Sequence, residues 1–198
     1  MRPGFAVRLA TVEPVHHLVG LAVRAERLGA AAVLVGEGGA GRDVFVAVAA
    51  MAVATERVAL LALSEGSSPA AVRRAGPALA ALDELSDGRV VGCFRAGALR
   101  TAGIAGHRVA AIAPRRRGPV PDGVVGVVTE DEPPVRGAGR WAVWSPPVLP
   151  ARLTGELPDA VAFRLERHDV EELAEVAARA GAAGLAVGVD LLGVLADD

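Results

Sequence analysis

Residues 36–41 (GEGGAG) are the clearest candidate for ligand chemistry in this sequence. They match the pattern G-x-G-x-x-G, follow an apolar strand-like run and precede a helix-like one. In that context, backbone N–H groups and a helix N-terminus can face an anion such as a phosphate. The alternative is a shortened loop of small residues that binds nothing. The pattern leaves both interpretations open.

Cysteine, histidine and arginine side chains are the other candidates. Cys93 is the single cysteine, which excludes an internal disulfide and a cysteine-rich zinc site, and its apolar surroundings predict a core residue. His16 and His17 lack acidic or cysteine partners at ligand spacing, so no metal site is predicted. The arginines at 115–117 either hold a polyanionic group or belong to a solvated loop.

The elements that must position these residues alternate between strand and helix in the first half of the chain. Strands are predicted at residues 5–9, 31–35, 58–63 and 90–94, and helices at 14–29, 43–55 and 68–85. The strands are continuous apolar runs, which is typical of a parallel sheet covered on both faces. Strand–helix units in series without a hairpin signal predict parallel strands with right-handed crossovers.

The second half is less regular. Strand candidates lie at residues 109–113, 124–128 and 141–144, and exposed loops are expected around 115–117 and 130–134. Near the end we expect strands at 160–165 and 185–189, with a helix between them that starts at a capping box and ends at Gly181. Trp141 and Trp144 face opposite sides of a strand, so at most one lines a pocket.

Composition limits the classes of function. The 198 residues suit one domain, and with 52% hydrophobic but only 3% aromatic residues its core must consist of Ala, Val and Leu. The net charge of −2 gives no electrostatic basis for binding nucleic acid. Residues 44–55, the longest nearly uncharged run, are too short to cross a membrane, and no signal peptide is recognised, so a cytoplasmic protein is predicted.

Three segments of the first half resemble the bacterial-luciferase-like family of monooxygenases and FMN- or F420-dependent oxidoreductases. Residues 22–30 and 33–37 are similar to its A-x-x-A-E-x-L-G helix and to its strand ending in Gly-Glu-His. Residues 42–50 and 54–58 resemble R-D-P-F-x-x-L-A and A-x-T-x-R-I. Residues 68–74 and 82–91 resemble H-P-x-x-x-A-R and L-D-x-L-S-x-G-R.

This resemblance implies a single α/β domain, residues 1–198, folded as a truncated or minimal TIM-type (β/α) barrel with parallel strands. About 200 residues is the practical floor for such a barrel. Residues 1–97 form its well-matched half, 98–158 an irregular, shortened part, and 159–198 a terminal β-α-β unit. The alternative is an open doubly wound sheet with a nucleotide at residues 36–41.

The resemblance also implies a cofactor, FMN or F420, at the C-terminal mouth of the barrel. The positions that would contact it are Glu37, Gly38, Ala62, Leu63, Arg95 and Gly97. Gly38 replaces the family's histidine, while Leu61 and Arg95 replace glycines, and the family's phosphate loop is not found in the second half. Arg95 at a strand end either binds an anion or pairs with a carboxylate such as Glu37 or Glu65. No catalytic residue is identified.

Two functions remain open. The first is a flavin- or F420-dependent oxidoreductase that carries out hydride transfer or monooxygenation of a small molecule. The second is a catalytically silent relative without a cofactor, which acts as a partner subunit or binds a small ligand. The resemblance implies that either would pair through the apolar second and third helices, as a homodimer or with a homologous subunit.

Overall fold

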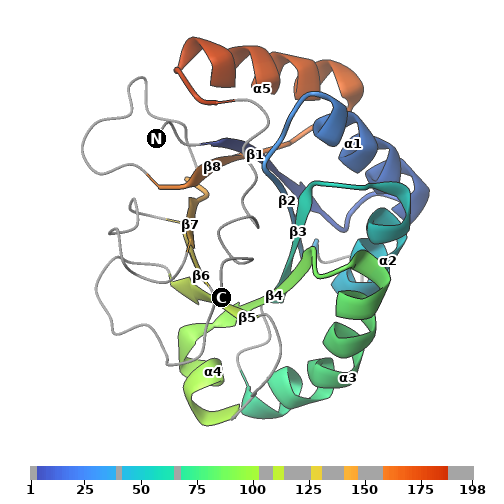
Figure 1. The fold of residues 1–198 in the computed structure, drawn as a ribbon, viewed down its shortest axis with the longest axis vertical. Helices are drawn as coiled ribbons and strands as arrows, with labels where there is room; N and C mark the ends of the chain where they lie inside the picture. Colours follow the sequence, from blue (N-terminus) through green and yellow to red (C-terminus); the bar gives the residue numbers. More distant parts are fainter. Residues whose placement is uncertain are drawn as a thin grey trace.

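The computed structural model describes residues 4–38, 42–64, 68–102, 109–113, 126–130, 141–146 and 158–186. Within them, eight parallel strands follow one another in chain order and close into a barrel, with the last paired to the first (Figure 1). The strands are β1 (Gly4–Ala10), β2 (Ala32–Gly36), β3 (Ala59–Ser64), β4 (Val90–Arg95), β5 (Val109–Ala113), β6 (Gly126–Thr129), β7 (Trp141–Trp144) and β8 (Ala160–Arg164). The helices are α1 (Val15–Arg27), α2 (Val44–Ala54), α3 (Pro69–Ser86), α4 (Ala96–Ala102) and α5 (Val170–Ala182).

The closed ring confirms the TIM-type barrel and corrects the idea that strands were lost. The barrel is minimal because its connections are short. Segments 114–125, 130–140 and 145–159 join the strands from β5 to β8, and each is shorter than segment 65–89, which contains α3. The open doubly wound alternative is wrong, because an open sheet does not pair its first strand with its last.

Two elements differ from the sequence predictions. Helix α4 was not expected, because its seven residues are too few to show a helical repeat. Of the strand predicted at 185–189, the two described residues, Leu185 and Ala186, are not part of the ring, in which β8 pairs with β1. Ala186 instead forms an isolated bridge to Gly4, and residues 187–189 lie outside the described residues.

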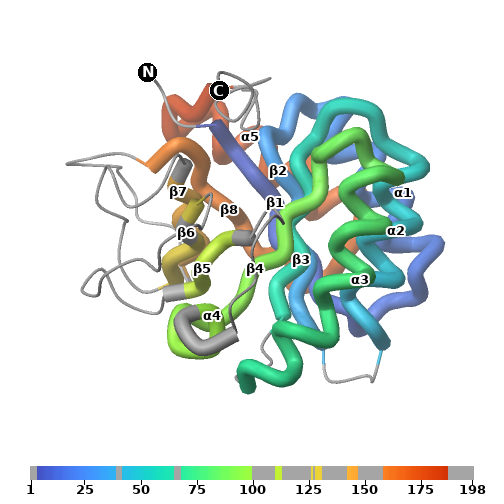
Figure 2. Tube along the Cα trace, turned by 60° about the horizontal axis from the view of Figure 1, so that its bottom comes forward, coloured from blue at the N-terminus to red at the C-terminus, as the bar shows by residue number. Residues whose placement is uncertain are grey.

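The helices follow one another around the outside of the ring. Helix α1 packs against α2, α2 against α3 and α3 against α4, while α5 lies on the other side of α1. Figures 1 and 2 show this layer beside the strands from β8 through β1 to β5. Helices α2 and α3 are each capped by the first residue of the range that the sequence predicts. Asp43 accepts the N–H groups of Phe45 and Val46, and Ser68 accepts that of Ala71.

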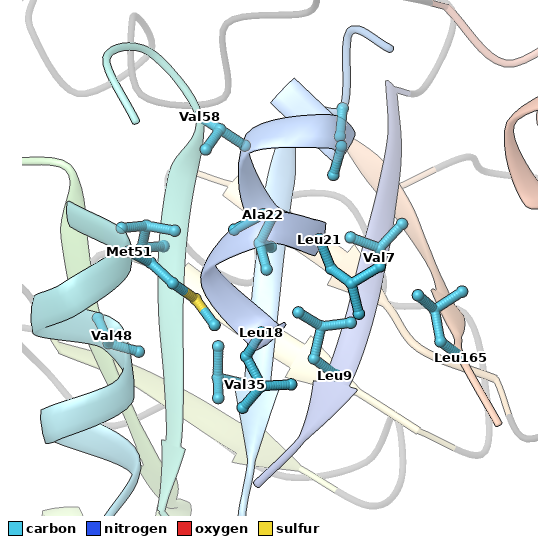
Figure 3. Packing of buried hydrophobic residues seen from close by; sticks show 14 of the residues in the cluster. Val7, Leu9, Leu18, Leu21, Ala22, Val35, Val48, Met51, Val58 and Leu165 are labelled. Atoms are coloured by element: carbon cyan, nitrogen blue, oxygen red, sulfur yellow. The ribbon is translucent and has the colours of Figure 1, made fainter. Parts of the chain in front are cut away.

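Side chains on the strands alternate between the inside of the barrel and the surrounding helices, where a separate cluster around Phe94 and Ala111 packs against α3 and α4. The helix-facing core joins Val7, Leu9 and Val35 to Leu18 and Leu21 of α1 (Figure 3). The second core fills the inside of the barrel with small and branched side chains from the same strands. Its members include Ala6, Leu34, Leu61, Leu63, Val91, Cys93, Ile112, Val128, Val143 and Ala162. Each buried leucine contributes about 1.5–3 kcal/mol, so aliphatic side chains alone can stabilise both layers.

Two of the family-like motifs contribute a side chain at the N-terminal end of the barrel. The carboxylate of Glu26 accepts the backbone N–H groups of Glu56, Arg57 and Val58, and so joins the end of α1 to the start of β3. Arg89 donates to the carbonyl oxygens of Ala52 and Thr55 and closes the end of α2. In this fold that end contributes stability, whereas ligands bind at the other. These motifs identify the scaffold and carry no evidence for a ligand.

Candidate functional site

A lateral cavity opens at the C-terminal end of the barrel, between β2, β3 and the start of α2. Its volume is about 510 Å³, within the range of small-molecule pockets. The lining is about equally polar and apolar and comprises Glu37, Gly38, Arg42, Asp43, Val44, Phe45 and Ser64. The Ser64 hydroxyl donates to Oε1 of Glu37 at 3.2 Å. Two of the six predicted cofactor positions therefore line one cavity.

Gly38 lies against the loop after β1. Its N–H donates to Oγ1 of Thr11 at 3.0 Å. A Cβ at this position would lie 2.6 Å from the backbone nitrogen of Val12 and 2.9 Å from the carbonyl carbon of Thr11. Real Cβ atoms do not approach backbone so closely. The family's histidine is thus absent because the chain itself fills the space, and the position cannot supply a proton-transferring ring.

A second polar group lies at the mouth on the inner side of the strands. Arg8 of β1 crosses the barrel and donates from Nη1 to Oε1 of Glu130 at 2.7 Å and to Oγ of Ser145 at 3.4 Å. Glu130 follows β6 and Ser145 follows β7. Both side chains of the ion pair are shielded, with exposed fractions of 19% for Arg8 and 27% for Glu130. Glu130 was predicted to lie in an exposed loop, and this contact corrects that prediction.

The inner face of the mouth carries two further arginines. Arg95 ends β4 in register with Ile112, and Arg164 ends β8 in register with Arg8. The alternation that places Cys93 and Ala162 inside the barrel places these two residues on the same face. Among the described residues, the guanidinium group of neither arginine forms a hydrogen bond or salt bridge. The predicted pairing of Arg95 with Glu37 is not present, and Glu65 lies outside the described residues.

The other predicted contacts are divided by strand alternation. Leu63 faces the inside of the barrel and is 2% exposed, whereas Ala62 faces the helices. Leu61 is fully buried one layer below the mouth, where the family has glycine. Gly97 is the second residue of α4, and a Cβ at this position would meet nothing within 4 Å. The sequence therefore placed these residues at the C-terminal end of the barrel but did not divide them between the lateral cavity and the inner face.

Arg8, Glu130 and Ser145 were missed, although one signal was available. Arg8 is the only charged residue of β1, GFAVRLA, in an otherwise apolar strand. A buried arginine requires a partner. The sequence does not identify the partner of Arg8, because Glu130 and Ser145 approach it only when the ring closes.

A buried histidine connects the mouth to two helices. Nε2 of His168 accepts the backbone N–H of Ala10 at 3.0 Å, while Nδ1 lies 3.2 Å from the carbonyl oxygen of Glu166. This pattern fits the neutral tautomer with the proton on Nδ1. His17, at the start of α1, contacts the carbonyl oxygen of His168 through its own Nε2. Both histidines are structural here.

Other reactive groups are not arranged for chemistry. Burial raises the pKa of the Cys93 thiol far above its ordinary value, so it stays protonated in the core, as the sequence predicts. Within the described residues, no cluster of three His, Cys, Asp or Glu side chains could hold a metal ion. No helix among the described elements has the length and apolar character needed to cross a membrane. Trp144 packs in the helix-facing core.

Comparison with known proteins supports the sequence resemblance. Residues 3–93, slightly less than half of the chain, match the family model described as luciferase-like monooxygenase. No curated protein matches the chain. The matched segment covers β1 to the middle of β4, and so includes the lateral cavity and Arg8.

Proposed function

We propose that this chain, whose residues 3–93 match the family model of luciferase-like monooxygenases, is a flavin- or F420-dependent oxidoreductase that acts on a small molecule. The observation that carries this proposal is the lateral cavity of about 510 Å³ at the ligand-binding end of the barrel. It lies beside a mouth that presents the guanidinium groups of Arg8 and Arg95.

The residues present fit a ring cofactor at the rim of the mouth. The cavity is large enough for a planar heterocycle, and the arginines suit its electron-rich carbonyl edge. Leu34, Leu61 and Leu63 fill the barrel below and are at most 2% exposed, so a ring cannot lie deeper. When bound, the cofactor would supply the hydride or activate oxygen.

The residues of the chain would orient the ligands and move a proton. Asp43 is committed to capping α2, and Arg42 donates to the carbonyl oxygens of Thr11 and Val12. Both therefore shape the cavity. Glu37 lines the same cavity, and its Oε1 accepts the Ser64 hydroxyl. We assign Glu37 as the group that accepts a proton from the substrate, with Ser64 holding its carboxylate in position.

Equilibrium binding of FMN and of F420, followed by fluorescence, tests this function. We expect a Kd in the micromolar range for one of them, and Arg95→Gln should weaken it about tenfold by removing one charge-assisted contact. Arg57→Gln is the matched control, because Arg57 is exposed at the opposite end of the barrel. If neither cofactor binds at high concentration, the oxidoreductase proposal fails for this chain.

A second candidate is a silent relative that acts as a partner subunit. It is favoured by an apolar groove of about 480 Å³ between α2 and α3, which includes Phe45, Val46, Ala78 and Leu85. Val46, Val53 and Leu85 are 61%, 71% and 50% exposed, although α2 is apolar on every side. Large exposed apolar patches mark interaction surfaces. We propose that a second copy of the chain, or a homologous subunit, covers this groove.

The oligomeric state tests the groove as an interface. Light scattering after size exclusion should give a dimer mass, and Val46→Glu should convert it to a monomer, because a buried unpaired charge opposes association. Val170→Glu is the matched control, since Val170 is 51% exposed at the start of α5. A monomeric unmodified chain would contradict the homodimer, as would a dimer that Val46→Glu leaves intact.

A further inference from the structure

Arg8 is held at the mouth by one half of its guanidinium group. Its Nη1 donates to Glu130 at 2.7 Å and to Ser145 at 3.4 Å. Nε and Nη2 donate to no residue in the described part of the chain. A guanidinium edge formed by Nε and Nη2 presents two parallel N–H groups, which is the geometry that binds a carboxylate through both oxygens.

Gly36 leaves space beside this edge. A Cβ built on Gly36 would lie 3.8 Å from Nη2 and 3.9 Å from Nε of Arg8. These two nitrogens are its nearest side-chain atoms, so Gly36 adjoins the open edge rather than the edge held by Glu130. Any side chain here would cover the N–H groups. The glycine thus leaves this edge free of any side chain from β2, while Glu130 and Ser145 hold the guanidinium group in a fixed orientation.

The charges on the inner face of the mouth favour an anion. Arg8, Arg95 and Arg164 lie on this face, whereas Glu130 is the only carboxylate that the described residues place there. The apolar side chains of Leu63 and Ile112 form the adjoining floor. A monoanion with a small apolar body matches this combination. A phosphate dianion matches less well, because Glu130 lies on the neighbouring half of the same guanidinium.

We propose that the Nε–Nη2 edge of Arg8 binds the carboxylate of a small, otherwise apolar substrate over Gly36, with Glu130 and Ser145 fixing the orientation of Arg8. The inference rests on the proposed function in one respect, since it places only the carboxylate of the substrate on the inner face, while the reacting part of the substrate meets the cofactor at the rim, beside the lateral cavity. Arg8 is in this sense a binding residue, and Glu130 is a positioning residue.

Titration with benzoate, its neutral analogue benzamide and inorganic phosphate tests the site in the protein without added cofactor. Saturation-transfer NMR and calorimetry should detect benzoate and give much weaker signals for the other two. Gly36→Ala should raise the Kd for benzoate by about tenfold or more. It should also fold, because its Cβ makes only ordinary van der Waals contacts and the backbone is not strained. Gly20→Ala, whose Cβ meets nothing within 4 Å in α1, is the matched control.

A second variant can test the proposal if Gly36→Ala does not fold. Arg8→Lys keeps the charge but removes the paired N–H groups, and should lose the preference for benzoate over benzamide. Absence of benzoate binding, unchanged binding in either variant, or preference for phosphate would overturn the proposal. Flavin binding without benzoate binding would remove only this inference. Benzoate binding without flavin or F420 binding would remove only the proposed cofactor.

Discussion

Glu26→Ala is expected to lower the free energy of unfolding by about 2–3 kcal/mol at pH 7, because it leaves three backbone N–H groups at the start of β3 without their acceptor. The carboxylate accepts from Arg57 at 2.6 Å, Val58 at 2.9 Å and Glu56 at 3.0 Å. Urea denaturation measures the loss. Glu84→Ala is the matched control, since Glu84 is exposed on α3 and should change stability by no more than about 0.5 kcal/mol.

The contribution of Glu26 should also depend on pH. Burial acts to raise the pKa of its carboxyl group, but the N–H groups of Arg57, Val58 and Glu56 outweigh burial and hold the pKa below its ordinary value. A lowered pKa stabilises the fold fully above the pKa of the unfolded chain, about 4.3. The stabilisation is lost as the pH falls through the lower folded value. Glu26→Gln should therefore lose this part of the acid dependence, and an unchanged stability–pH curve would refute the assignment.

Gly38→His, which introduces the family's histidine, is expected to lower the free energy of unfolding by about 3 kcal/mol or more. It is not expected to improve activity. The backbone of Thr11 and Val12 occupies the space that the new Cβ needs. Because the obstacle is backbone, a rotamer change cannot relieve it. The loop after β1 must therefore move, and this movement breaks the hydrogen bond from the Gly38 N–H to Oγ1 of Thr11. Thermal unfolding should show a lower Tm, with reduced binding of any mouth ligand.

Gly38→Ala separates the steric effect from the chemistry of histidine. It should account for most of the lost stability, because the clash begins at Cβ. Gly181→Ala, where a Cβ meets nothing within 4 Å, should retain or raise the stability of α5. A Gly38→His protein as stable as the unmodified chain would show that the loop yields easily, and would reopen this position for proton transfer.

The site was predictable in part, for reasons visible in single residues. Glu37 and Gly38 could be placed at the mouth because they directly follow a buried strand, and the C-terminal ends of parallel strands share one edge. Ala62 and Leu63 could not be sorted without the register, because adjacent residues of a strand face opposite sides. The pairing of Leu63 with Cys93 is what assigns it to the inside.

The sequence by itself determined the scaffold, through local signals. Continuous apolar runs set the strands from β1 to β4, Asp43 and Ser68 set the starts of α2 and α3, and serial order made the strands parallel. Only the tertiary structure decided that eight strands close, that Arg8 meets Glu130 across the ring, and that Gly38 lies against Thr11. These contacts join residues far apart in the chain, since Arg8 and Glu130 are 122 positions apart. Closure is a property of the whole ring, whereas a sequence pattern reports only the few residues that form one element.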